Sequence, residues 1–307
     1  MLVEKLSHLS LIKISGEDAT SFLQGQLTND VALASNNWQH TGYCTPKGRL
    51  FALLILWKFD QDYYALLDKT ITETTLKRLR MYIMRSKVVI EELENNLYGV
   101  MDCDYEKLNQ LDLDSIDLTE SKKTTFISNK QTHFLSFGDR AILSSDQPLD
   151  KKLEAIESNS RWLIQDINDG IANINLLNTE LFIPQMINLD VIGGINFKKG
   201  CYTGQEVVAR MHYLGKLKQR MFVCKINKST GKESDIEQIQ AGDKIFSDES
   251  LTSSAGTIVN ITNDHALAVL RLDNIDLDGK DKAQSVFSLN QEVSLEINQQ
   301  QPYSFET

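Results

Sequence analysis

About two thirds of the way along the 307-residue chain, the sequence reads Lys198-Lys199-Gly200-Cys201-Tyr202-Thr203-Gly204-Gln205-Glu206. Thr203 is followed three residues later by Glu206 and then by apolar residues, a spacing that predicts a capping box at the start of a helix. Cys201 would then lie just before a helix N-terminus, where free amide hydrogens, the helix dipole and two lysines favour a thiolate. The segment therefore predicts that Cys201 is the most nucleophilic or metal-avid cysteine of the chain.

An alternative interpretation stays open for this cysteine. Most free cysteines are buried and behave as small hydrophobic side chains, and Cys201 could be one of them. For Cys44, Cys103 and Cys224, which lie in strand-like runs, burial is the preferred interpretation. The four cysteines are far apart and form no C-x-x-C pair, so neither a disulfide framework nor a structural zinc site is expected.

The flanking sequence predicts a mixed α+β fold with a β-rich C-terminal domain. We expect short helices over 16–25 and within 149–169, a longer helix over 70–85, and a polar loop over 112–123. Predicted strands are 40–44, 50–59, 63–67, 97–101, 133–137 and 141–143. From Met221 onward, short runs at 221–226, 244–246, 256–261, 266–270 and 293–297 favour a small antiparallel barrel or sandwich. We therefore expect an α+β region over 1–215 and a β-domain over 216–307.

Composition and missing motifs exclude several classes of protein. The N-terminus lacks the pattern of a secretory signal, and the apolar run 50–59 is too short to span a bilayer, so a cytoplasmic protein without a membrane partner is expected. No nucleophile elbow, P-loop or dinucleotide fingerprint occurs, which gives no support to a hydrolase, a kinase or a dehydrogenase. The five histidines are scattered, and no metal site is predicted.

Charge is distributed unevenly along the chain. The whole chain carries −10, yet the segment 198–232 holds nine basic residues and one acid and is therefore +8. A protein this acidic is not expected to coat DNA or other nucleic acids, but its basic segment could attract a small polyanion or a limited length of RNA. A solvated basic surface without a ligand is an equally weighted alternative.

Several motifs together resemble the YgfZ family of folate-binding proteins. The segment Lys199 to Glu206 meets the family pattern K-G-C-[FY]-x-G-Q-E in full. Further resemblance lies in Gly16-Glu17-Asp18-Ala19, in Phe22 to Asp30, in Lys47-Gly48, in Phe182 to Gln185, in Asn188-Leu189, in Gly193 to Ile195, and in Pro302-Tyr303-Ser304. The family is related to the T-protein of the glycine cleavage system, an aminomethyltransferase. The resemblance therefore implies ferredoxin-like α+β subdomains around a central cavity, with a C-terminal antiparallel β-barrel.

The resemblance also implies a folate site built around Cys201 as the working thiol. Trp162 corresponds to a tryptophan that borders folate in the family, and Leu9 stands where the family has a second tryptophan, so that wall is aliphatic here. Glycines beside Cys201 would let the backbone approach a ligand, and cations would hold the glutamate tail of folate. The remaining candidate contacts are Lys198, Lys199, Gly200, Tyr202, Gly204, Gln205, Glu206 and Arg210, with Lys47 and Arg49 as further basic candidates.

By resemblance, the leading hypothesis is an accessory protein that binds tetrahydrofolate or a one-carbon derivative. Its partners would be iron–sulfur proteins or their assembly factors, and it would support tRNA modification indirectly through an iron–sulfur enzyme. Two alternatives stay open. One is a folate-dependent aminomethyltransferase, which needs an acid–base carboxylate that the sequence does not place. The other is an RNA-binding module that uses the basic segment 198–232.

Overall fold

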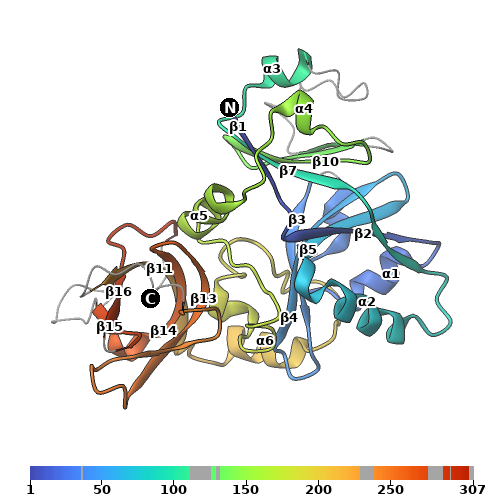
Figure 1. Cartoon of the computed structure of the whole chain (residues 1–307). Helices are drawn as coiled ribbons and strands as arrows, with labels where there is room; N and C mark the ends of the chain where they lie inside the picture. The colour runs from blue at the N-terminus through green and yellow to red at the C-terminus, as the bar shows by residue number, and fades with distance from the viewer. Residues whose placement is uncertain are drawn as a thin grey trace. The chain divides into compact units, whose positions relative to one another are not determined.

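The computed structural model (Figure 1) describes residues 1–35, 37–110, 126–128, 132–228, 238–275, 286–290 and 292–303. The chain forms two compact units, each assembled from separate parts of the sequence. The first unit comprises residues 1–43, 52–162 and 198–202, and the second comprises residues 44–51, 163–197 and 203–307. The predicted loop 112–123, Lys232 of the basic segment and Ser304 lie outside the described residues.

A first five-stranded sheet has the strand order β3-β4-β5-β2-β6. Its strands are β2 (Leu9–Ser15), β3 (Gln39–Cys44), β4 (Leu50–Phe59), β5 (Asp62–Asp68) and β6 (Val89–Leu93). The predicted helices around this sheet are confirmed as α1 (Ala19–Gln24), which ends at Gly25, and α2 (Lys69–Ile83). Asp68 caps α2 by accepting from the Thr70 amide at 2.9 Å, and α2 packs on β2, β5 and β6.

A second five-stranded sheet, all antiparallel, has the order β1-β7-β10-β9-β8. Its strands are β1 (Leu2–Lys5), β7 (Asn96–Met101), β8 (Phe126–Ser128), β9 (Thr132–Ser136) and β10 (Arg140–Ser145). The short helix α3 (Tyr105–Gln110) follows β7. Tyr98, Val100 and Phe134 belong to the buried core of this sheet, and the predicted strands 97–101, 133–137 and 141–143 are thereby confirmed.

The helical pattern over 149–169 forms two helices, α4 (Asp150–Leu153) and α5 (Ser160–Asn168). Between them, Glu154 adopts a left-handed conformation, and Ile156 forms a parallel bridge with Glu4 of β1. The carboxylate of Glu4 also accepts from the Trp162 amide at 2.9 Å, so it satisfies a free amide in the first turn of α5. Pairing with a strand more than 150 residues away therefore overrides the local helical pattern.

The C-terminal region is a closed antiparallel barrel with the order β11-β14-β13-β12-β15-β16. Its strands are β11 (Gln219–Lys228), β12 (Lys244–Phe246), β13 (Ser254–Thr262), β14 (His265–Arg271), β15 (Val286–Ser288) and β16 (Val293–Ile297). The expected barrel is confirmed, and the short strand β15 is an addition to it. The domain division at residues 215/216 stays a prediction, although the first barrel strand begins close to it, at Gln219.

Short 3₁₀ helices occur at Val31–Ser35, Pro184–Ile187 and Leu272–Asn274. In the part of the chain that the structure describes, every helix is too short or too polar to cross a lipid bilayer.

Candidate functional site

Cys201 lies in the loop 198–202 of the first unit, and its side chain is exposed to solvent. Tyr202, the next residue, is buried with 7% of its surface exposed. No heavy atom comes within 4 Å of the position that a Cβ on Gly200 would take. The loop thus presents an accessible thiol beside open space, and the alternative interpretation of Cys201 as a buried hydrophobe is wrong.

Lys199 fixes this loop to the segment that follows α1. Its ammonium group donates to the carbonyl oxygens of Leu27 at 2.7 Å and Asn29 at 2.8 Å, and it lies 5.3 Å from the ring centre of Tyr202. Burial lowers the pKa of Lys199 to about 8, although the charge of Asp30 opposes that shift. Lys199 therefore holds two parts of the family signature together, and its expected contact with the folate tail stays a prediction.

The segment that receives Lys199 is itself tightly ordered. Asn29 donates from its side chain to the His40 carbonyl at 3.0 Å, and its backbone amide donates to the Thr41 hydroxyl at 3.1 Å. The Thr28 hydroxyl accepts from the Gly42 amide at 2.7 Å. These bonds fasten residues 28–30 to β3, so the anchor of the Cys201 loop is a rigid one.

The other three cysteines have a different environment. Cys44 in β3 and Cys224 in β11 are fully buried, and Cys103, just after β7, is partly buried. Burial raises the pKa of the Cys44 and Cys103 thiols to about 12 and raises that of Cys224 further still. All three are therefore held as thiols, as expected for packing residues, although Cys103 lies in a loop rather than in a strand.

Trp162 and Leu9, the two residues expected beside a pterin ring, belong to one hydrophobic cluster of the first unit. Trp162 is only 2% exposed and packs closely on Gly99 and Leu6. Leu9 is half-buried at the edge of the same cluster. The indole of Trp162 has no exposed face in this conformation, so its predicted stacking on a pterin would need a local opening.

Sequence reasoning missed a cation in this cluster. Arg140 is 3% exposed, and its guanidinium lies over the Trp162 ring, 4.5 Å from the ring centre. His40 is buried nearby, and its Nδ1 has no hydrogen-bond partner among the described residues. Burial and the positive charge of Arg140 lower the pKa of His40 to about 4, so the imidazole is neutral at physiological pH.

Two aromatic rings extend this arrangement. Trp38 and Phe137 are both half-buried, and their ring centres are 4.2 Å apart. Phe137 also meets Trp162 edge to face at 6.2 Å, and Trp38 meets His40 in the same way at 5.3 Å. No periodic pattern in the sequence links these residues, because they come from β3, β10, α5 and the loops beside them.

The predicted capping box is wrong. α6 (Gln205–Tyr213) has Gly204, not Thr203, as its N-cap, and no side chain caps it. Gly204 has a φ of +83°, a conformation that glycine adopts without steric cost. Glu206 is exposed and pairs with Arg210 at 2.9 Å, one turn further along α6. A left-handed glycine therefore starts the helix in place of a hydroxyl.

The turn between β3 and β4 explains two of the signature glycines. A Cβ on Gly204 would lie 2.4 Å from the Thr45 carbonyl oxygen, and one on Gly48 would lie 2.5 Å from Cβ of Val207. Both glycines therefore allow α6 to pack directly against the turn 45–48, and neither is needed to admit a ligand there. Of the basic candidates in this turn, Lys47 is exposed, while Arg49 donates to the Leu181 carbonyl at 2.6 Å.

The remaining candidates lie on the surface or at its edge. Lys198 and Arg210 are exposed, and Gln205 is half-buried at the first position of α6. Their predicted contacts with folate stay predictions. Among the described residues, no group of three or more histidine, cysteine or acidic side chains could hold a metal ion.

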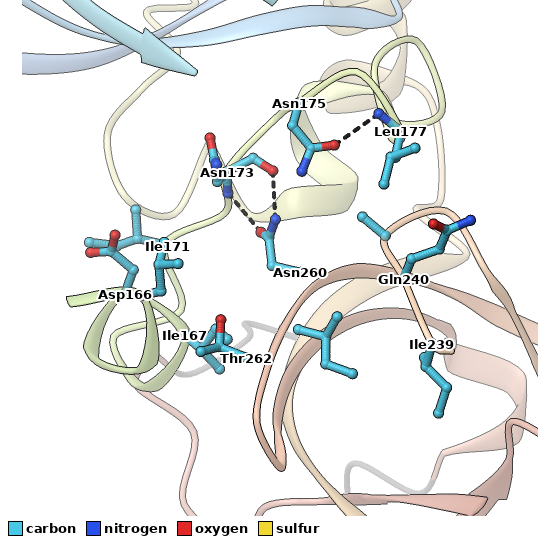
Figure 2. A pocket seen from close by; sticks show the side chains of 13 residues that line it. Asp166, Ile167, Ile171, Asn173, Asn175, Leu177, Ile239, Gln240, Asn260 and Thr262 are labelled. Atoms are coloured by element: carbon cyan, nitrogen blue, oxygen red, sulfur yellow. Dashed lines mark hydrogen bonds between the residues drawn. The ribbon is translucent and has the colours of Figure 1, made fainter. Parts of the chain in front are cut away.

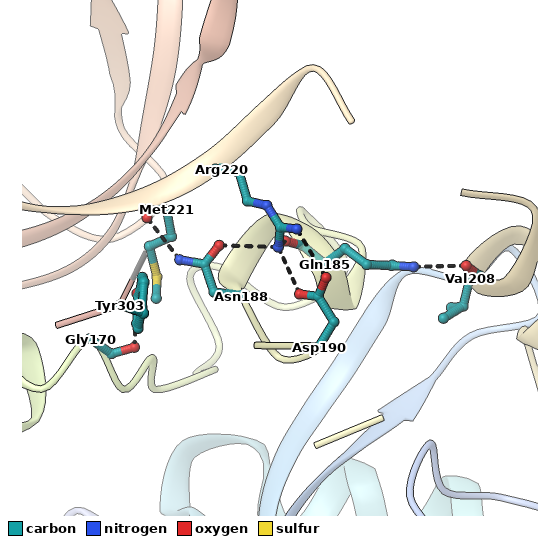
Figure 3. Close-up of polar contacts among 8 residues, drawn as sticks. All are labelled: Gly170, Gln185, Asn188, Asp190, Val208, Arg220, Met221 and Tyr303. Atoms are coloured by element: carbon teal, nitrogen blue, oxygen red, sulfur yellow. Dashed lines mark hydrogen bonds and ion pairs between the residues drawn. The ribbon is translucent and has the colours of Figure 1, made fainter. Parts of the chain in front are cut away.

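The signature residues Gln185, Asn188 and Tyr303 belong to a polar network in the second unit (Figure 3). Arg220 of β11 makes a two-pronged ion pair with Asp190, at 2.7 and 3.0 Å, and also donates to the Gln185 carbonyl at 2.9 Å. The Asn188 side chain donates to the Met221 carbonyl at 2.8 Å. The network joins the segment 184–190 to the barrel and thus has a structural role.

The second unit also contains a cavity of about 250 Å³ between α5, the segment 171–177 and the barrel (Figure 2). Isoleucine, leucine and amide side chains line it, and Asp166 is its one charged lining residue among those described. Asn173 and Asn260 bond each other twice across it, at 2.7 and 2.8 Å. Without a cation or an aromatic ring, this cavity does not match the chemistry of a folate.

Comparison with known proteins decides the family. The chain is 34% identical over 228 residues to the tRNA-modifying protein YgfZ of Hamiltonella defensa, a match that covers 71% of this chain and 68% of the relative. The chain belongs to the YgfZ family. The YgfZ protein of Enterobacter sp. (strain 638) is 30% identical over 314 residues, which cover 98% of this chain and 93% of that protein. An uncharacterized protein of Haemophilus influenzae is 33% identical over 307 residues, covering 97% of each chain.

The fold of this YgfZ family member is that of the glycine cleavage T-protein. The aminomethyltransferase T of Bartonella henselae superposes with a TM-score of 0.72 at 14% identity, covering 96% of this chain and 84% of that structure. This likeness confirms the expected α+β architecture with a C-terminal barrel. No protein-family model matches the chain.

Proposed function

We propose that this chain binds tetrahydrofolate or a one-carbon derivative and supports the assembly or repair of iron–sulfur clusters, and through an iron–sulfur enzyme the modification of tRNA. The observation that carries the proposal is the exposed thiol of Cys201 on a loop that Lys199 anchors to a second signature segment. Membership in a family whose relatives are named tRNA-modifying proteins supports the same role.

The folate would be held in the first unit, near the cluster that contains Trp162. A pterin needs apolar or aromatic walls, and Leu9, Trp38 and Phe137 are half-buried members of that cluster. A glutamate tail needs cations, which the exposed Lys198 can supply, and which Arg140, 3% exposed over Trp162, can supply once the same local opening has occurred. The folate would bring a reduced pterin and its one-carbon group, and the chain would provide the walls, the cations and the thiol.

Titration with tetrahydrofolate, followed by tryptophan fluorescence, tests the binding step. Of the three tryptophans, Trp38 is half-buried, and we expect its emission to change saturably at sub-millimolar ligand. Arg140→Gln should weaken binding, whereas Arg85→Gln, an exposed arginine of the same unit, should bind as the wild type does. Thermal unfolding of each variant separates lost binding from lost folding. No saturable change in the wild-type protein would overturn the folate proposal.

A further inference from the structure

The C-terminal end of α6 presents apolar side chains to solvent. Tyr213 is 64% exposed and Leu214 is 86% exposed, in a second unit whose barrel core is otherwise well buried. Contiguous exposed apolar side chains with polar residues around them are a feature of binding surfaces. The neighbouring positions Arg210, His212, Lys216 and Lys218 are exposed as well.

Backbone hydrogen bonds order the segment that carries these side chains. The amides of Leu214 and Gly215 both donate to the Arg210 carbonyl at 2.9 Å, which closes the end of the helix tightly. A Cβ on Gly215 would lie 2.8 Å from Sδ and 3.0 Å from Cα of Met211, so a larger residue there would crowd Met211. Further along, the Lys218 carbonyl accepts from the Leu272 amide at 2.9 Å. Both ends of the segment 210–218 are therefore anchored.

An ordered group of flat rings lies on this segment. The Phe197 and His212 rings stack with centres 3.7 Å apart and an interplanar angle of 10°. The Tyr213 ring lies nearly perpendicular to both, with centre distances of 6.3 Å to Phe197 and 4.6 Å to His212. Because Tyr213 is 64% exposed, its ring can offer an open surface to a ligand.

The charge around the rings is positive. Residues 207–228 contain six basic residues and no acidic one. Three of these cations have acidic partners, since Arg210 pairs with Glu206, Arg220 with Asp190 and Lys225 with Asp264. Lys216 and Lys218 are exposed and follow Tyr213 by three and five residues in the sequence, and the charge of Lys218 also reaches Asp273, whose pKa it helps to lower.

We propose that the α6 end surface, formed by Phe197, Arg210, His212, Tyr213, Leu214, Lys216 and Lys218, binds RNA directly through unpaired bases. Exposed rings stack on bases of any sequence, and lysines beside them neutralise the phosphates. The strong local charge in a chain of net charge −10 would confine RNA to this surface. The inference goes beyond the proposed function, in which tRNA is reached only through another enzyme.

Binding of fluorescently labelled tRNA and of a single-stranded oligoribonucleotide, each measured at several salt concentrations, tests this inference. We expect saturable binding that weakens with salt. Tyr213→Ala should weaken it about tenfold, as expected for the loss of one stacked base. The double variant Lys216→Gln/Lys218→Gln should also weaken binding and lower the logarithmic salt slope by about 1.4. The matched control Lys151→Gln/Lys152→Gln removes two exposed lysines from α4 and should bind as the wild type does.

Three outcomes would overturn the inference: no saturable RNA binding, equal loss in the control variant, or RNA binding that Tyr213→Ala leaves unchanged. Competition by heparin but not by unlabelled oligoribonucleotide would show a polyanion site without base stacking and would also overturn it. Tetrahydrofolate titration of the same variants keeps a failure here separate from a failure of the folate proposal.

Discussion

The Cys201 loop and the Arg220 network both contain signature residues of the family, yet they differ in which side chains they expose to solvent. In the loop, Lys199 and Tyr202 are buried or partly buried and Cys201 between them is open to solvent. In the network, Arg220 and Asp190 pair with less than a fifth of each side chain exposed. The signature therefore combines buried residues that hold the fold, such as Gln185 and Asn188, with an exposed cysteine, and burial distinguishes the two kinds.

The largest effect is expected in the network. Arg220→Met leaves the Asp190 carboxylate in a mostly buried place without its partner, which should cost about 3–5 kcal/mol of stability. Urea unfolding measures the loss. The double variant Asp190→Leu/Arg220→Met should recover part of it, because no unpaired charge remains. Arg271→Gln, which breaks the exposed pair with Asp273, is the control and should leave stability unchanged. An equal, small effect of Arg220→Met and Arg271→Gln would contradict a structural role for the network.

A smaller effect should distinguish the two glycines beside the thiol. Gly204→Ala forces a left-handed conformation on alanine and places its Cβ against the Thr45 carbonyl, so we expect a loss of about 1–2 kcal/mol. Gly200→Ala adds a Cβ in open space and should be close to neutral for stability. The melting temperatures of the two variants measure this difference. A lower melting temperature for Gly200→Ala than for Gly204→Ala would contradict the prediction.

Lys199 should show a moderate effect with a distinct pH dependence. Lys199→Met removes two bonds to carbonyl oxygens and should cost about 1 kcal/mol near neutral pH. Because burial lowers the pKa of Lys199 to about 8, the unfolded chain binds more protons than the folded one between pH 8 and the ordinary value of 10.5. The stability of the wild type relative to Lys199→Met should therefore rise with pH in that window. A fall across the same window would contradict the burial of the ammonium group.

The smallest effect on stability is expected at the thiol itself. Cys201→Ser should leave the unfolding free energy unchanged because the side chain is exposed. Iodoacetamide should alkylate Cys201 in the native protein well before Cys44 and Cys224, which are fully buried. Peptide mass spectrometry measures the order of modification. Alkylation of Cys44 or Cys224 before Cys201 would contradict the exposure of Cys201.

Patterns in the sequence predicted the helices and strands whose formation depends on residues close together in the chain. The helix expected over 70–85 is α2, and the strands expected over 40–44 and 50–59 are β3 and β4. The start of α6 was mispredicted because Gly204 with a positive φ replaced a capping hydroxyl.

Contacts between distant residues could not be predicted in the same way. Lys199 bonds carbonyl groups 170 and 172 residues away, and Arg140 meets Trp162 only because β10 and α5 come together. The sequence therefore identified the reactive-looking cysteine, whereas the residues that anchor its loop and the buried cation of the aromatic cluster required the structure.

The central claim is that Cys201 is the working thiol of a folate-binding protein that supports iron–sulfur enzymes. Its most direct measurement is the activity of an iron–sulfur tRNA-modifying enzyme in a bacterial strain that lacks its own YgfZ protein and carries variants of this chain. We expect Cys103→Ala, which changes a partly buried cysteine, to restore activity, and Cys201→Ser at equal protein levels to restore little or none. Full restoration by Cys201→Ser would contradict the claim.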